Sequence, residues 1–92
     1  MERRDFSTYD AIISRAAELI TQLEIGETFD WRMLFGEEEW TEITADFSGQ
    51  WVGRLLSRRF TEGADPEIQF IEVAPSPRRS VFRKIREVNG RG

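Results

Sequence analysis

Residues 47–60, FSGQWVGRLLSRRF, place hydrogen-bonding and cationic side chains at helical spacing. Gln50 and Arg54 fall on one face of such a helix, and Arg58 flanks that face one turn further on. A guanidinium can bind O6 and N7 of guanine as a fork, and a glutamine amide can do the same for N6 and N7 of adenine. Amides at the helix start, beside Ser48, could donate to a phosphate. The stretch therefore predicts a helix face that could read base edges.

The opposite side of this helix is apolar and can face a core. It is formed by Val52, Leu55, Leu56 and Phe60, while Ser57 and Thr61 extend the polar side. Arg59 falls in the middle of the apolar side, so it must either extend past the helix end or pair with a carboxylate. Gly49 and Gly53 each cost about 1 kcal/mol of helix propensity, which favours a close-packing reason for their presence.

A second basic group lies near the C-terminus. The segment APSPRRS, residues 74–80, joins two β-rich runs, and its two prolines should make the tip of a hairpin stiff and exposed. We expect this tip to present Arg78 and Arg79, and the returning strand to present Arg83 and Lys84. Such cations would supply salt-dependent attraction to phosphates. A charged loop that protects an edge strand from aggregation is the other interpretation of the same residues.

A group of acidic side chains lies in the sequence between the predicted N-terminal helix and the first basic group at 47–60. They are Glu37, Glu38, Glu39, Glu42 and Asp46. Because they lack the alternating oxygen-ligand spacing and the glycine of a calcium loop, we expect a solvated acidic helix and no metal site. An array of carboxylates can also imitate phosphates electrostatically, so the group is an alternative surface for a protein partner.

Composition excludes several kinds of chemistry. The 92 residues include no cysteine and no histidine, which removes thiolate metal sites, disulfides and the commonest general base. We therefore expect a non-enzymatic protein without a cofactor. No apolar run approaches the roughly 20 residues of a membrane span, so we expect a soluble, cytoplasmic protein with no membrane partner. The net charge of -4 is polarised, because residues 1–50 carry -8 and residues 51–92 carry +4.

Apolar periodicity and turn residues predict the elements that must position these groups. We expect helices over 8–24, over 31–43 with a break at Gly36, and over 48–60, followed by strands over 67–73 and 80–87. The segment ETFDW, residues 27–31, is a brief extended piece, too short for an independent strand. The predicted core consists of Ile13, Ile20, Phe29, Leu34, Trp40, Leu55, Leu56, Phe70 and Val81.

This order of elements resembles the winged helix-turn-helix, an α+β fold with three helices followed by a β-hairpin wing. The resemblance covers residues 8–88, which we take as one domain between a flexible N-terminus, residues 1–7, and a flexible tail, residues 89–92. The stretch GETFDWRMLF, residues 26–35, with the later tryptophan and the G-x-L-L spacing, is also similar to small uncharacterised bacterial and phage families.

The winged-helix resemblance implies a role for each basic group. The third helix would enter the major groove of DNA with Gln50, Arg54 and Arg58, and the wing would contact the DNA backbone through Arg78 and Arg79. The acidic residues would then have to point away from the DNA. The resemblance therefore implies a DNA-binding protein or transcriptional regulator.

Two other functions remain open. A small acidic protein can act as a phage-type inhibitor, anti-CRISPR or anti-restriction, which blocks a nuclease by occupying its nucleic-acid channel. A winged helix can also bind a protein partner or form a homodimer without any role in DNA binding, because fold does not fix function.

Overall fold

The computed structural model describes residues 6, 8–62, 66–75 and 78–87. Within them the helices are α1 (Tyr9–Gln22), α2 (Trp31–Phe35), α3 (Glu37–Asp46) and α4 (Gly49–Thr61). The strands are β1 (Thr28–Phe29), β2 (Ile68–Pro75) and β3 (Arg78–Lys84). The chain therefore has an α+β fold, and the predicted helices and strands are each present within a few residues of their expected bounds.

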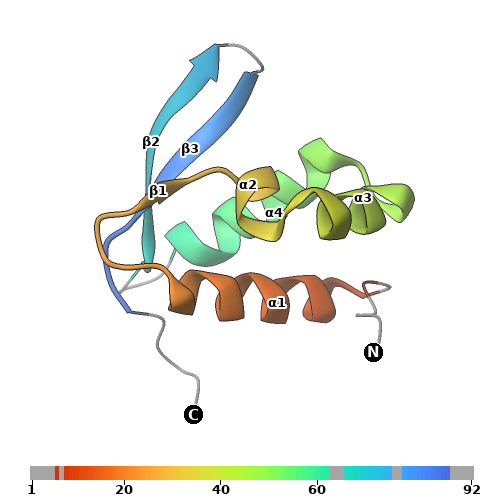
Figure 1. Cartoon of the computed structure of the whole chain (residues 1–92), viewed down its shortest axis with the longest axis horizontal. Helices are drawn as coiled ribbons and strands as arrows, with labels where there is room; N and C mark the ends of the chain where they lie inside the picture. The colour runs from red at the N-terminus through yellow and green to blue at the C-terminus, as the bar shows by residue number, and fades with distance from the viewer. Residues whose placement is uncertain (1–5, 7, 63–65, 76–77, 88–92) are drawn as a thin grey trace.

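The strands form one antiparallel sheet in the order β1-β3-β2. The central strand β3 places Phe82 opposite Phe29 of β1 and opposite Phe70 of β2. Figure 1 shows the β2–β3 hairpin rising from a layer formed by the helices, with α1 on the far side of that layer from the hairpin tip. The extended piece at 28–29 is thus a strand of the sheet, because β3 provides the pairing partner that so short a segment needs.

The core lies between the helices and the base of the sheet. The indole of Trp31 is at its centre, with ring centroids 5.4 Å from Phe29, 5.3 Å from Phe82 and 6.3 Å from Phe60. The buried cluster contains Phe6, Ile12, Ala16, Ile20, Phe29, Trp31, Phe35, Ile43, Val52, Leu56, Phe60, Ile68 and Phe82. Because four elements meet at one indole, this contact fixes α2 and α4 against β1 and β3.

Local signals account for the helix boundaries. The side chains of Thr8, Asp30 and Ser48 each accept a hydrogen bond from the amide three residues further on, which caps α1, α2 and α4. Gly36 has a φ of 90° between α2 and α3, a conformation that glycine adopts far more readily than other residues. The predicted break at Gly36 is therefore confirmed, and it separates two helices.

The predicted core is correct for Ile20, Phe29 and Leu56 but wrong for Phe70. Phe70 is 50 % exposed, although it packs edge-to-face on the buried Phe82 at 5.8 Å between ring centroids. The physical reason is its place on β2, an edge strand whose pairing with β3 also shifts register between Phe70 and Glu72. An edge position covers one side of the ring and leaves the other to solvent. The remaining predicted core side chains, Ile13, Leu34, Trp40, Leu55 and Val81, are half-buried.

The hairpin and the N-terminus also differ from expectation. Arg78 and Arg79, expected in the loop, belong to β3, where they pair with Pro75 and Ala74. Phe6 lies in the segment predicted to be flexible, yet it is buried and its ring contacts Phe35 at 6.4 Å between centroids. The rest of the predicted flexible N-terminus and the predicted tail at 89–92 lie outside the described residues.

Candidate nucleic-acid interface

The predicted reading face lies on the outer side of α4. Gln50, Arg54 and Arg58 are exposed, while Val52 and Leu56 on the other side are buried. Four-residue spacing brings the three polar side chains into one row, since a helix repeats every 3.6 residues. The sequence prediction of a two-sided helix is therefore confirmed for these five residues.

Ser57 and Thr61 do not belong to this exposed row. The Ser57 hydroxyl donates to the carbonyl oxygen of Gly53 at 2.6 Å and accepts from the Trp31 indole N–H at 3.2 Å. Thr61 donates to the Ser57 carbonyl oxygen at 2.6 Å, and both side chains are half-buried. The Ser57 hydroxyl therefore links α4 to Trp31 of α2, whereas the Thr61 hydroxyl bonds to the backbone of α4 itself.

The guanidinium groups along the row are accessible. Arg54 forms no hydrogen bond or ion pair with any residue that the structure describes. Arg58 donates from Nε to Glu62 Oε2 at 3.3 Å, and the two side chains are 73 % and 64 % exposed. An ion pair that is so exposed contributes little and exchanges readily with another anion. Both arginines can therefore take an external acceptor without breaking a buried contact.

Arg59 falls in the middle of the apolar side of α4 in the sequence, but it is not buried in the core. Its side chain is exposed, and its guanidinium carbon lies 5.5 Å from the ring centroid of the neighbouring Phe60. The aliphatic part of the side chain can cover the edge of the core while the charge stays in water. Of the two arrangements expected for Arg59, a pairing with a carboxylate is not formed among the described residues, and the side chain is exposed.

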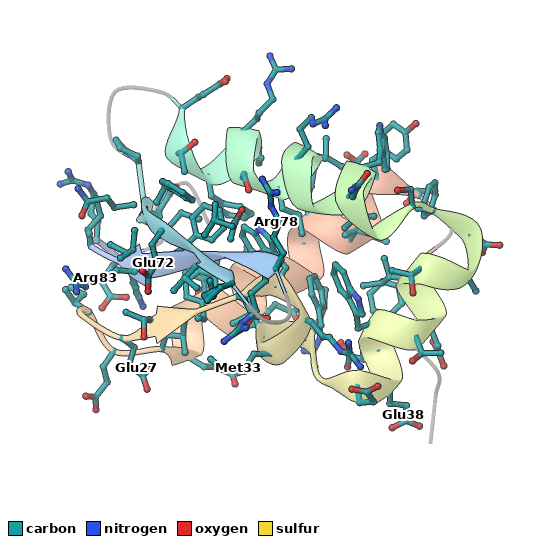
Figure 2. All side chains as sticks on the ribbon, turned by 90° about the horizontal axis from the view of Figure 1, so that it is seen from above. Glu27, Met33, Glu38, Glu72, Arg78 and Arg83 are labelled. Atoms are coloured by element: carbon teal, nitrogen blue, oxygen red, sulfur yellow. The ribbon has the colours of Figure 1, made fainter. Side chains whose placement is uncertain are left out.

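The arginines of the hairpin are not equivalent. Arg78 is exposed and forms no ion pair with the described part of the chain, and Figure 2 shows it on the α4 side of the hairpin. Arg79 donates from Nε to Asp30 Oδ2 at 3.0 Å, which ties β3 to the N-terminus of α2. Arg83 is exposed but lies well apart from Arg78, with Glu72 nearer to it (Figure 2). Of these three arginines, Arg78 is therefore the one that is exposed on the side of α4.

Lys84 is removed from the predicted interface, because it is fully buried at 0 % exposure. Its ammonium donates to the carbonyl oxygens of Ile20 at 2.9 Å and Leu23 at 2.7 Å, and to Glu87 Oε1 at 3.1 Å. The last turn of α1 contains no basic residue of its own. Lys84 therefore supplies, from β3, the positive charge and the donors that the carbonyl end of a helix lacks.

The acidic residues of α3 are partly neutralised within the molecule. Glu39 accepts two hydrogen bonds of 2.9 Å from Arg15 of α1, and this pairing raises the pKa of the Arg15 guanidinium. Glu37 pairs with Arg32 at 2.7 Å, and the hydrogen bond, together with the nearby positive charge, lowers the pKa of the Glu37 carboxyl. Glu38 and Asp46 are exposed without such a partner among the described residues, and Glu38 extends from α3 into solvent in Figure 2.

A shallow groove lies beside the predicted reading face. It has a volume of about 320 Å³ and is lined by Ile13, Trp51, Arg54, Leu55, Arg58, Arg59 and Glu62. Sequence reasoning missed it, because Ile13 comes from α1 and the other residues come from α4 and its C-terminal end. The one sequence signal was Arg59 on an otherwise apolar face.

The described residues contain no group of three or more His, Cys, Asp or Glu side chains arranged to hold a metal ion. Across the same part of the chain, none of the helices combines the length and apolar character needed to cross a membrane. No family model, no curated protein and no solved structure matches this chain.

Proposed function

We propose that this chain is a non-enzymatic DNA-binding protein of the winged helix-turn-helix type, with α4 as the helix that reads the major groove. The observation that carries the proposal is the exposed row of Gln50, Arg54 and Arg58 along α4. Among the described residues Arg54 has no ion-pair partner and Arg58 has only an exposed one. The two guanidinium groups and the Gln50 amide match the hydrogen-bonding pattern of purine edges.

The position of the hairpin supports this proposal. Arg78 lies four positions before Phe82 on β3, so its side chain leaves the strand on the face from which Phe82 packs against the helices. A cation there can contact a phosphate next to the groove that α4 occupies. Because Arg79 is tied to Asp30 and Lys84 is buried, we assign the wing contact to Arg78 first.

The alternative function, inhibition of a nuclease through an acidic face, has less support. Two of its five carboxylates, Glu37 and Glu39, already pair with arginines of the same chain. A phosphate mimic needs unpaired charge, because its attraction to a partner comes from the field that its own cations would cancel.

The test compares alanine substitutions on α4 and on the hairpin. We expect Arg54→Ala to cost about 1–3 kcal/mol, mainly on one preferred DNA sequence, because a bidentate base contact discriminates between bases. Arg78→Ala should weaken all sequences alike and reduce the salt slope by about 0.9, since one phosphate contact is lost. Fluorescence anisotropy with a randomised duplex pool at two salt concentrations measures both effects.

Arg32→Ala is the matched control, because Arg32 is an exposed arginine on α2, outside both groups. Its substitution should leave the sequence preference unchanged. If the wild-type protein binds no duplex more tightly than about 100 μM even at low salt, it falls outside the non-specific range of DNA-binding proteins and the proposal is withdrawn.

A further inference from the structure

The groove between α1 and α4 has an apolar floor. Ile13 of α1 faces Trp51 and Leu55 of α4, and all three side chains are half-buried. Trp51 is held in place by other rings, with centroids 4.7 Å from Tyr9 and 5.4 Å from Phe47. The floor is therefore a fixed surface whose apolar area is only partly covered by the chain itself.

The rim of the groove carries an excess of positive charge. Arg54, Arg58 and Arg59 line it, and Glu62 is the one carboxylate among the lining residues. Glu62 is already engaged with Arg58 in an exposed contact of 3.3 Å, which another carboxylate could replace at little cost. Guanidinium forks bind planar carboxylates in a bidentate manner, so the rim is complementary to a ligand of that charge and shape.

Size restricts the ligand further. A volume of about 320 Å³ lies at the lower end of the range for small-molecule sites, and such sites combine apolar walls with a few polar groups that orient the ligand. We infer that the groove binds a compact apolar carboxylate, with its hydrocarbon body on Trp51 and Leu55 and its carboxylate against the arginines of the rim.

This site shares Arg54 and Arg58 with the face proposed to read DNA, so a bound ligand affects DNA binding. Arg54 and Arg58 cannot bind a base edge while they hold a carboxylate, so ligand and DNA exclude each other. The ligand thus acts as an effector that releases DNA. This regulatory step rests on the proposed DNA-binding function, whereas binding of the carboxylate does not.

Binding is tested by nuclear magnetic resonance titration of the full chain with naphthoate. We expect saturable shifts at the amides of Ile13 and of residues 51–59, with a Kd of about 1 mM or tighter. Naphthylmethanol, which lacks the charge, and acetate, which lacks the apolar body, should each bind at least about tenfold more weakly. An absence of saturable shifts with naphthoate overturns the inference.

Substitutions separate the ligand site from the DNA-reading face. Arg58→Gln should weaken naphthoate binding about tenfold, and the control Arg32→Gln should leave it unchanged. Glu62→Gln should strengthen it a few-fold, because the competing carboxylate is gone; this change is on the surface and does not threaten folding. Ile13→Gln should weaken naphthoate binding while leaving DNA affinity within about twofold, since Ile13 contributes no group to DNA.

The regulatory step is tested by adding naphthoate to the protein–DNA complex. We expect the apparent Kd for DNA to rise with ligand concentration in the wild type and much less in Ile13→Gln. Naphthoate binding with unchanged DNA affinity overturns the effector role. If the wild type binds no DNA, the proposed function fails and the titration alone decides the ligand site. Tight binding of an acidic amphipathic peptide, with no binding of naphthoate, overturns the inference in favour of a peptide-docking groove.

Discussion

At the scale of single residues, Lys84 makes the contacts that most depend on the complete fold. Its ammonium reaches the carbonyl oxygens at the end of α1, which are 61 to 64 residues away in the sequence. The last carbonyl oxygens of a helix lack the full set of intrahelical donors, although that of Ile20 also accepts from the Leu23 amide at 3.0 Å, and burial makes an unpaired oxygen costly. The only lysine of the chain is therefore a helix cap that joins β3 to α1.

We predict that Lys84→Met lowers the free energy of unfolding by about 1–3 kcal/mol, because methionine fills a similar volume but removes the ammonium donor from the carbonyl oxygens of Ile20 and Leu23. Arg83→Met is the matched control. Arg83 is the exposed neighbour on the same strand, and its substitution should change stability by less than about 0.5 kcal/mol. Urea denaturation followed by circular dichroism measures both values. Equal stability of Lys84→Met and wild type would show that the cost of burying the ammonium cancels its hydrogen bonds.

At the scale of elements, α4 serves two neighbouring surfaces. Leu56 is fully buried in the core, while Leu55, one residue earlier, is half-buried and forms part of the groove wall. A helix turns by about a quarter of a circle per residue, so adjacent leucines can serve different surfaces. The sequence alone placed both of them in the core.

We predict that Leu56→Ala costs about 2–5 kcal/mol of stability, because it leaves a cavity in the packed core. Leu55→Ala should cost clearly less, about 1 kcal/mol, since solvent can enter the space that it leaves. Thermal and urea unfolding of the two variants provide the comparison. A Leu55→Ala cost equal to that of Leu56→Ala would mean that the groove wall is as tightly packed as the core.

At the scale of the whole molecule, charge is divided between α3 and α4. The net charge of -4 works against DNA binding, and the exposed carboxylates of α3 that have no partner in the described part of the chain contribute to that repulsion. Glu38 and Asp46 are such residues, whereas reversal of Glu37 or Glu39 would also break an ion pair.

We predict that the double variant Glu38→Lys, Asp46→Lys strengthens non-specific DNA binding about threefold at low salt, because a repulsive contribution is removed. Pull-down from a host lysate with wild type and variant tests the rival function at the same time. Loss of a captured nuclease in the variant, without any gain in DNA affinity, would favour the inhibitor.

Sequence patterns were sufficient for the features that depend on neighbours along the chain. The apolar spacing of α1 and α4, the break at Gly36 and the exposed row on α4 all follow from residues within a few positions of one another. Such features depend on backbone conformation and on helix and strand periodicity, which short segments specify by themselves.

Tertiary structure alone decided the contacts between distant segments. Lys84 is buried because the end of α1 comes to lie beside β3, and Arg79 is occupied because the N-terminus of α2 lies beside the hairpin. Phe70 is exposed because β2 is an edge strand, and the groove exists because α1 and α4 meet at Ile13 and Leu55. The sequence of a single strand or helix does not specify which distant segment will pack against it. Residue type and spacing therefore could not distinguish a buried helix cap from a phosphate contact.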